Sequence, residues 1–169
     1  MTFKSVAKAL NIVLTVVVLV LLAAKIPGII DNFKTEGSAA PDFSVLTNSG
    51  LEFNTKDLHA RKVLVFWATW CPPCEMELSR INELVKEKRI PAEAILAISM
   101  QEDKALVDKV VTERGYQFPI GYDLDGQVSQ LFKIQGTPTL VFLNGDKTIR
   151  WLSTGLSPLL KLRLNIFLD

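Results

Sequence analysis

The two cysteines of this chain, Cys71 and Cys74, enclose a pair of prolines and lie between two segments of different periodicity. The segment before them, Lys62–Ala68 (KVLVFWA), is a nearly continuous run of β-branched and aromatic residues, which predicts a central strand buried on both faces. In the segment after them, Glu75–Lys88, apolar residues recur at helical spacing, and Pro91 lies just beyond its end. The sequence therefore places a C-x-x-C pair where a buried strand passes into a helix.

This position predicts different roles for the two thiols. At a helix N-terminus, free backbone amides and the helix dipole favour an anion, so we expect Cys71 to lose its proton more easily and to act as the nucleophile. Cys74 lies within reach of a mixed disulfide on Cys71 and is expected to resolve it by intramolecular attack. Pro72 and Pro73 supply no amide hydrogen to a sulfur and stiffen the turn, so they influence the balance between dithiol and disulfide. The pattern predicts thiol-disulfide exchange and leaves its direction open.

Other uses of a cysteine pair fit the sequence less well. A structural disulfide that closes so short a loop restricts the unfolded chain little, and two cysteines are too few for a disulfide framework. A zinc site needs about four ligands, and His59 is the only histidine. Copper carriage through two thiolates and one histidine is an alternative on the same fold, although we expect His59 in a surface loop. We predict no metal and no cofactor.

The remaining pattern predicts a mixed sheet covered by helices. A hairpin over Asp42–Thr47 and Leu51–Thr55 comes first, because an Asn-Ser-Gly turn separates two short extended segments. Further strands are expected at 62–68, 94–99, 118–122, 140–143 and 148–153, and helices at 75–88, 103–114, 127–134 and 157–168. Ser157 is expected to cap the last helix, and Leu106 to face inward from the second. Parallel strands joined through helices, followed by an antiparallel hairpin and a last helix, predict an α/β fold with a mixed central sheet.

The N-terminal residues predict a membrane anchor. The stretch Ala9–Ala24 carries no charged side chain, and its extension through Val6 and Ile26 approaches the ~20 residues that a spanning helix needs. Lys4 and Lys8 precede it, so the positive-inside rule places the N-terminus in the cytoplasm and the rest of the chain across the membrane. A cleaved signal peptide is the alternative, because small residues lie near the end of the apolar run.

Length and charge fit one domain behind this anchor. The chain has 169 residues, and about 130 remain after the apolar segment, which suits one ordinary domain and is too short for two. We predict the anchor over residues 1–26, a flexible linker over 27–41 and a single domain over 42–169. The formal net charge is +1, from 19 basic and 18 acidic side chains, so nucleic-acid binding is not expected.

Two motifs resemble the thioredoxin superfamily. They are Phe66–Cys74 (FWATWCPPC) and Gly136–Thr139 (GTPT), and the similarity extends from about Pro41 to the C-terminus. The start of that region, Pro41–Phe43 (PDF), is similar to the membrane-anchored extracytoplasmic branch of the superfamily, the TlpA/ResA/CcmG-like proteins. The resemblance implies a thioredoxin fold with the hairpin as an N-terminal extension and one N-terminal transmembrane helix.

The resemblance also implies a substrate-binding surface beside the cysteines. In the family, the bond that matches Thr137-Pro138 is cis and faces the cysteines, where the backbone pairs with an extended substrate peptide. Trp70 adjoins the nucleophile and is expected to shield it or to contact substrate. Pro72 and Pro73 complete the predicted substrate-binding residues.

One acidic residue is implied in catalysis. Glu77, three residues after Cys74, matches an acidic position that influences cysteine reactivity in several of these reductases. The chain departs from cytoplasmic thioredoxins at Val65, where those proteins hold a buried aspartate that accepts a proton from the second cysteine. Proton transfer from Cys74 is therefore expected to use Glu77, water or the substrate.

The implied function is a protein-disulfide reductase on the periplasmic side of the cytoplasmic (inner) membrane, held by a single span. A membrane thiol transporter is the implied electron donor, and apocytochrome c or another exported thiol protein is the implied substrate. An oxidase that donates its disulfide is the enzymatic alternative, since direction follows the reduction potential. Copper or metal carriage is the non-enzymatic alternative. A peroxidase is less expected, because only Thr69 remains of the residues usual before a peroxidatic cysteine.

Overall fold

The computed structural model describes residues 12–17, 20 and 36–169 and divides the chain into two units, Met1–Thr35 and Glu36–Asp169. In the first unit, residues 12–17 and 20 are helical. No helix within the described ranges is long and apolar enough to cross a membrane. The predicted anchor over residues 1–26 lies largely outside these ranges, and so do residues 27–35 of the predicted linker.

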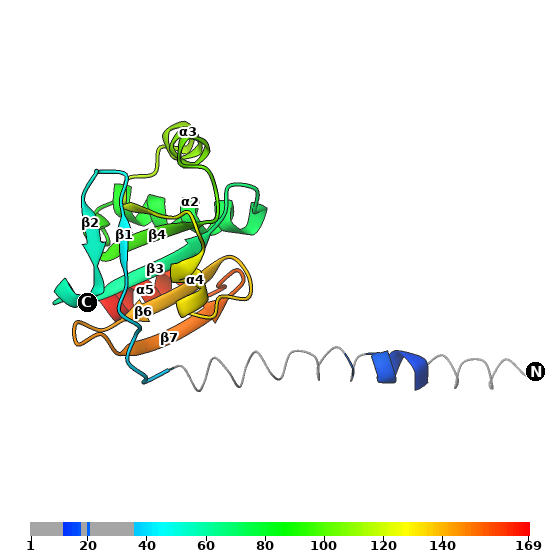
Figure 1. The fold of residues 1–169 in the computed structure, drawn as a ribbon. Coiled ribbons are helices and arrows are strands. Elements are labelled where there is room, and N and C mark those ends of the chain that lie inside the picture. The colour runs from blue at the N-terminus through cyan, green and yellow to red at the C-terminus, as the bar shows by residue number, and fades with distance from the viewer. Residues whose placement is uncertain (1–11, 18–19, 21–35) are drawn as a thin grey trace, which may run out of the picture. The chain divides into compact units, whose positions relative to one another are not determined.

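The second unit is built on a five-stranded mixed sheet (Figure 1). Its strands are β3 (Lys62–Trp67), β4 (Ile95–Met100), β5 (Ile120–Asp123), β6 (Thr139–Leu143) and β7 (Ile149–Thr154), in the spatial order β5-β4-β3-β6-β7. β3, β4 and β5 are parallel, whereas β6 is antiparallel to both β3 and β7. β3 is the central strand, and the side chains of Val63–Trp67 are all fully buried, as the apolar run predicts.

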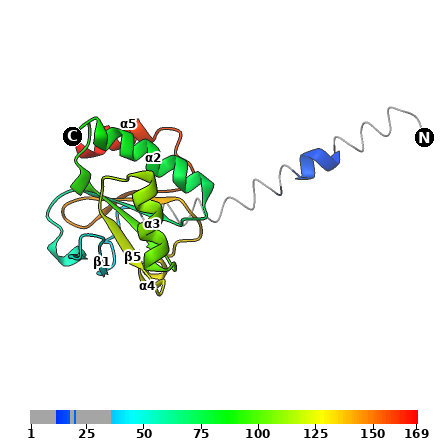
Figure 2. The ribbon, with the colours of Figure 1, turned by 90° about the horizontal axis from the view of Figure 1, so that it is seen from above.

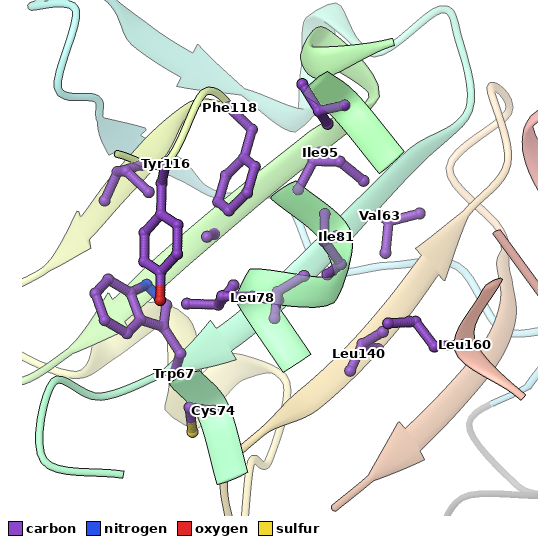
Figure 3. Packing of buried hydrophobic residues seen from close by; sticks show 14 of the residues in the cluster. Val63, Trp67, Cys74, Leu78, Ile81, Ile95, Tyr116, Phe118, Leu140 and Leu160 are labelled. Carbon is purple, nitrogen blue, oxygen red and sulfur yellow. The ribbon is translucent and has the colours of Figure 1, made fainter. Parts of the chain in front are cut away.

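Helices and a hairpin cover the two faces of this sheet (Figure 2). Three helices, α2 (Pro72–Lys86), α3 (Lys104–Arg114) and α5 (Leu160–Leu168), pack on one face around the larger hydrophobic core. The other face is covered by α4 (Gln127–Leu131) and by the hairpin of β1 (Ser44–Leu46) and β2 (Glu52–Asn54). Two short 3-10 helices, Thr55–Asp57 and Ala92–Ala94, precede β3 and β4. Figure 3 shows Leu78 and Ile81 of α2 in the larger core, over side chains of the sheet.

This architecture confirms the predicted thioredoxin-like α/β fold with its N-terminal hairpin. The predicted strands and helices are present with shifts at their ends. The most consequential shift is that of α2, which begins at Pro72 rather than at Glu75 and so includes Cys74. Prolines are tolerated there because the amides of a first helical turn have no partner within the helix.

Two predictions about helix residues are wrong. The last helix has Leu159 as its N-cap, not Ser157, whose backbone N–H instead donates to the carboxylate of Glu77. The side chain of Leu106 is 46% exposed, because Val107 and Val111 form the buried stripe of α3.

The chain that precedes β3 pairs locally with both edges of the sheet. Ala39 forms an antiparallel bridge with Thr148 beside β7, and Thr47 forms one with Gly121 of β5. Residues 37–40, which the sequence assigns to the linker, therefore run along an edge of the sheet. Covering an edge in this way protects it from pairing with another chain.

Candidate active site

The cysteine pair lies where β3 passes into α2. Cys71 is the N-cap of α2 and is disulfide-bonded to Cys74, with the two Cα atoms 5.3 Å apart. The residue Cys71 is 5% exposed, and Cys74 is fully buried. Figure 3 shows Cys74 at the start of α2, in the core cluster that includes Trp67. Of the two residues, only Cys71 keeps any exposure, so its sulfur is the one that another protein can reach more easily.

Two donors point at the sulfur of Cys71. The backbone N–H of Cys74 donates to Cys71 Sγ at 3.2 Å, and the hydroxyl of Thr137 donates to it at 3.4 Å. Pro72 and Pro73 occupy the first positions of α2 and carry no N–H, so Cys74 supplies the first amide that the helix offers to the sulfur.

The Thr137-Pro138 loop lies beside the cysteines, as predicted. Its peptide bond is cis, which confirms the expectation from the motif. The Thr137 hydroxyl contact brings a loop 66 positions away in sequence to the Cys71 sulfur. The loop is also tied to the chain after β7, because the N–H of Gly155 donates to the carbonyl oxygen of Pro138 at 2.7 Å.

A second carboxylate, which sequence reasoning missed, holds the loop before Cys71. The backbone N–H of Thr69 donates to Glu102 Oε1 at 3.1 Å and to Oε2 at 2.9 Å, and the Thr69 hydroxyl donates to Oε1. Glu102 follows β4, the parallel neighbour of β3. The ends of neighbouring parallel strands meet at one edge of a sheet, and this rule could have pointed to the polar turn after β4.

Of the residues predicted to contact substrate, three are exposed around Cys71, whereas Thr137 is half-buried and Pro138 is buried. Trp70 is 75% exposed, and Pro72 and Pro73 are exposed beside it. Trp67, three positions earlier, is fully buried, in line with its predicted place in the core. A large indole left in water beside a reactive sulfur is available for contact with another molecule.

Glu77 is fully buried on α2. Its Oε1 accepts the N–H of Ser157 at 3.2 Å, and its Oε2 accepts from Arg80 Nη1 at 3.2 Å. Burial raises the pKa of Glu77 above its ordinary value of 4.5, while the Ser157 N–H bond and the Arg80 guanidinium act in the opposite direction. Within the described residues, neither oxygen is hydrogen-bonded to a cysteine.

The other sites considered from the sequence are apolar or exposed. Val65 is fully buried in the same core cluster as Cys74, so its side chain offers no proton acceptor there. His59 is exposed, as expected for a loop residue. In the part of the chain that the structure describes, no three His, Cys, Asp or Glu side chains are grouped as a metal site.

Comparison with known proteins finds relatives by sequence and a shared fold by structure. The model of the AhpC/TSA family matches residues 37–152. The thiol-disulfide oxidoreductase ResA of Geobacillus kaustophilus is 35% identical over 148 residues, covering 83% of this chain and 85% of the relative. ResA of Oceanobacillus iheyensis is 32% identical over 145 residues, covering 77% and 74%. The crystal structure of StoA from Bacillus subtilis shares the fold, with a TM-score of 0.64 at 21% identity over 73% of this chain and 95% of that one.

Proposed function

Since the chain belongs to the AhpC/TSA family and is a thiol-disulfide oxidoreductase, we propose that it reduces disulfides of exported proteins. The observation that carries this proposal is the surroundings of Cys71. This sulfur caps α2, belongs to the residue of the pair that keeps some exposure (5%, against none for Cys74), and contacts the cis-proline loop through Thr137. An attacking thiol, a resolving thiol and a loop for an extended peptide are therefore adjacent.

The reaction begins on the reduced enzyme. The thiolate of Cys71 attacks one sulfur of a substrate disulfide, forms a mixed disulfide and releases the other substrate sulfur as a thiolate. Cys74 then attacks Cys71 Sγ, which re-forms the Cys71–Cys74 disulfide and releases the second substrate thiolate. Two electrons pass from the enzyme dithiol to the substrate, and the two thiol protons end on the released substrate thiols.

The substrate contacts follow from what is exposed. Trp70, Pro72 and Pro73 form an exposed rim beside Cys71, and the half-buried Thr137, which lies shortly before β6, contacts the Cys71 sulfur. We assign this rim to an extended segment of the substrate, paired with the backbone of Thr137. Backbone pairing accepts many sequences, which suits an enzyme that acts on more than one exported protein.

The two prolines support the reductase direction over the oxidase alternative. A C-x-x-C enzyme is a strong oxidant when its reduced form, with the first sulfur as a thiolate, is well stabilised. In α2 the first two helical positions carry no N–H, so Cys71 receives one backbone amide, from Cys74. Fewer donors to the thiolate favour the disulfide form and a more reducing enzyme.

Glu77 is assigned as the proton acceptor for Cys74. The two residues are three positions apart on α2, so their side chains are neighbours on the helix surface, and both are buried. Burial raises the pKa of Glu77, which brings its proton affinity closer to that of a thiol. Val65 leaves no competing carboxylate at the position that cytoplasmic thioredoxins use.

The N-terminal segment and the resemblance support a proposed location and proposed partners for the enzyme. We propose that residues 1–26 anchor the chain by a single span in the cytoplasmic membrane, with the catalytic domain on the periplasmic side. A membrane thiol transporter then supplies electrons, and apocytochrome c is the proposed substrate.

The reduction potential of the full chain tests the direction. The chain is equilibrated in thiol buffers. Cys71→Ser and Cys74→Ser are the controls, because neither variant can form the Cys71–Cys74 disulfide. A potential near or below ~-270 mV supports the reductase, whereas one near ~-120 mV makes the enzyme an oxidant. Absence of a reversible couple, together with stoichiometric Cu(I) binding by the reduced chain, would favour the metal carrier.

The location is tested by labelling the cysteines in intact cells with a membrane-impermeant maleimide. Reduced Cys71 is expected to react without lysis, and Cys71→Ser should remove most of the label because Cys74 is buried. Labelling that appears only after lysis would place the domain in the cytoplasm.

A further inference from the structure

Arg80 and Ser157 enclose the carboxylate of Glu77. Arg80 Nη1 donates to Glu77 Oε2 at 3.2 Å and to the carbonyl oxygen of Ser157 at 2.9 Å. The backbone N–H of Ser157 donates to Glu77 Oε1 at 3.2 Å. These three bonds close a ring that joins α2 to the segment before α5. Both carboxylate oxygens are thereby held.

The charge on Arg80 matters because Glu77 has no access to water. A fully buried carboxyl group becomes neutral unless a cation or hydrogen-bond donors offset the loss of hydration. The side chain of Arg80 is 32% exposed, so the guanidinium itself keeps part of its hydration while it contacts the buried anion. A charge-assisted bond in this geometry favours the ionised carboxylate.

The neighbouring charged groups on the elements around Glu77 are engaged elsewhere. Lys161 of α5 lies 3.8 Å from Glu83, and Arg114 at the end of α3 lies 2.9 Å from Glu75. The segment before α5 faces Glu77 with a peptide group rather than with a charge. Among the described residues, Arg80 is therefore the cation in contact with Glu77.

We propose that Arg80 is a positioning residue for disulfide exchange, which holds Glu77 in place as a carboxylate ready to accept the proton of Cys74. This inference rests on the proposed role of Glu77 as that acceptor. In the resolving step the proton passes from Cys74 Sγ to Glu77. The Cys74 thiolate then forms a bond to Cys71 Sγ, and the bond from Cys71 Sγ to the substrate sulfur breaks with its electron pair on the substrate. Return of the proton to the departing thiolate restores the Glu77–Arg80 pair.

A purely structural role for Arg80 makes a different prediction. If Arg80 only ties α2 to the segment before α5, its loss lowers the unfolding temperature and leaves the pH dependence of exchange unchanged, even though the pKa of Glu77 rises when its cation is removed. If Arg80 sets the proton affinity of the acceptor for Cys74, the pH dependence of exchange moves together with the pKa of Glu77, and a cation of similar length restores both.

The test follows the titration of Glu77 in the reduced full chain by the 13C chemical shift of its side-chain carboxyl, which is identified by its loss in Glu77→Gln. Arg80→Met should raise the pKa of Glu77 by about one unit, a tenfold change in its protonation equilibrium. In Arg80→Lys, the pKa of Glu77 should return most of the way to its wild-type value. Arg89→Met, which removes an exposed arginine 3.7 Å from Glu87, is the matched control and should leave Glu77 unchanged. Arg80→Gln replaces Arg80→Met if the latter does not fold.

The rate of mixed-disulfide resolution as a function of pH separates the possible failures. In Arg80→Met, the rise of the rate at low pH should shift to higher pH by the same number of pH units as the pKa of Glu77. In a Glu77→Gln background, Arg80→Met should have no further effect on the profile. An unchanged titration of Glu77 in Arg80→Met overturns the inference about Arg80. The role of Glu77 as proton acceptor still stands in that case if Glu77→Gln removes the low-pH limb of the rate profile. A profile that Glu77→Gln does not alter overturns the role of Glu77 itself.

Discussion

Glu77 and Glu102 hold the chain on the two sides of the cysteine pair, and they do so in different surroundings. Glu102 binds the loop before Cys71 by accepting the N–H and hydroxyl of Thr69, and it is only half-buried. Glu77 follows Cys74 and binds the segment before α5 by accepting the N–H of Ser157, and it is fully buried. Both carboxylates accept backbone hydrogen bonds, but only Glu77 has an arginine against it.

The difference separates two uses of a carboxylate beside a reactive thiol. Water solvates part of Glu102, so its charge needs no partner and its bonds serve to hold a loop. Glu77 has exchanged its water for a peptide N–H and a guanidinium, and burial raises its pKa. The buried carboxylate therefore depends on its cation, whereas the half-buried one holds its loop through hydrogen bonds.

The largest effect is expected from Glu77→Ala. This substitution leaves the Ser157 N–H without its acceptor and Arg80 without its anion, and it should lower the free energy of unfolding by about 1–3 kcal/mol. Denaturant unfolding at neutral pH measures this loss. A change within error would mean that the buried carboxylate contributes nothing net and would remove the contrast with Glu102.

The pH dependence of the free energy of unfolding in Glu77→Gln tests the effect of burial on Glu77 further. Because burial raises the pKa of Glu77, the folded chain binds its proton more tightly than the unfolded chain. The resulting stability is complete below the ordinary pKa of 4.5 and is lost as the pH rises through the raised value. Glutamine does not titrate, so the variant should lose less stability than the wild type over that interval. An equal loss in both would show that other groups produce the pH dependence.

A smaller effect is expected from Glu102→Ala. The substitution removes the acceptor of Thr69, but the half-buried N–H regains contact with water, so we expect a loss of about 1 kcal/mol. Glu102→Gln keeps one acceptor oxygen and should lose less. Denaturant unfolding compares the two variants with Glu77→Ala. A loss larger than that of Glu77→Ala would reverse the ranking drawn from burial.

The smallest effect is expected from Lys161→Gln. Lys161 of α5 forms an ion pair with Glu83 of α2 at 3.8 Å, and both side chains are largely exposed (47% and 62%). An ion pair of this kind contributes less than about 0.5 kcal/mol, and salt screens it. The reduction potential should be unchanged. A substantial loss would mean that exposure is a poor guide to how strongly α5 is held.

The local part of the site could be predicted from sequence. The apolar run of β3 and the helical stripe of α2 together placed the C-x-x-C pair at a helix N-terminus, because the two signals lie within a few residues of each other. The motif at Thr137-Pro138 predicted the cis bond and its place beside the cysteines. Helix ends were predicted less well, since Ser157 had the residue type and the following proline of a cap but its N–H went to Glu77.

The chain's own sequence determined the thiol chemistry, the order of strands and helices, and which side of each element is apolar. Only the tertiary structure decided which polar groups hold the segments on either side of the cysteine pair, because those contacts join residues that are 33 positions apart for Thr69 and Glu102 and 77 apart for Arg80 and Ser157. Such pairs depend on which strands are neighbours and on where α5 packs. Glu77 has the sequence context of an ordinary helix-surface residue, and it became a buried, arginine-paired carboxylate because the segment before α5 covers it.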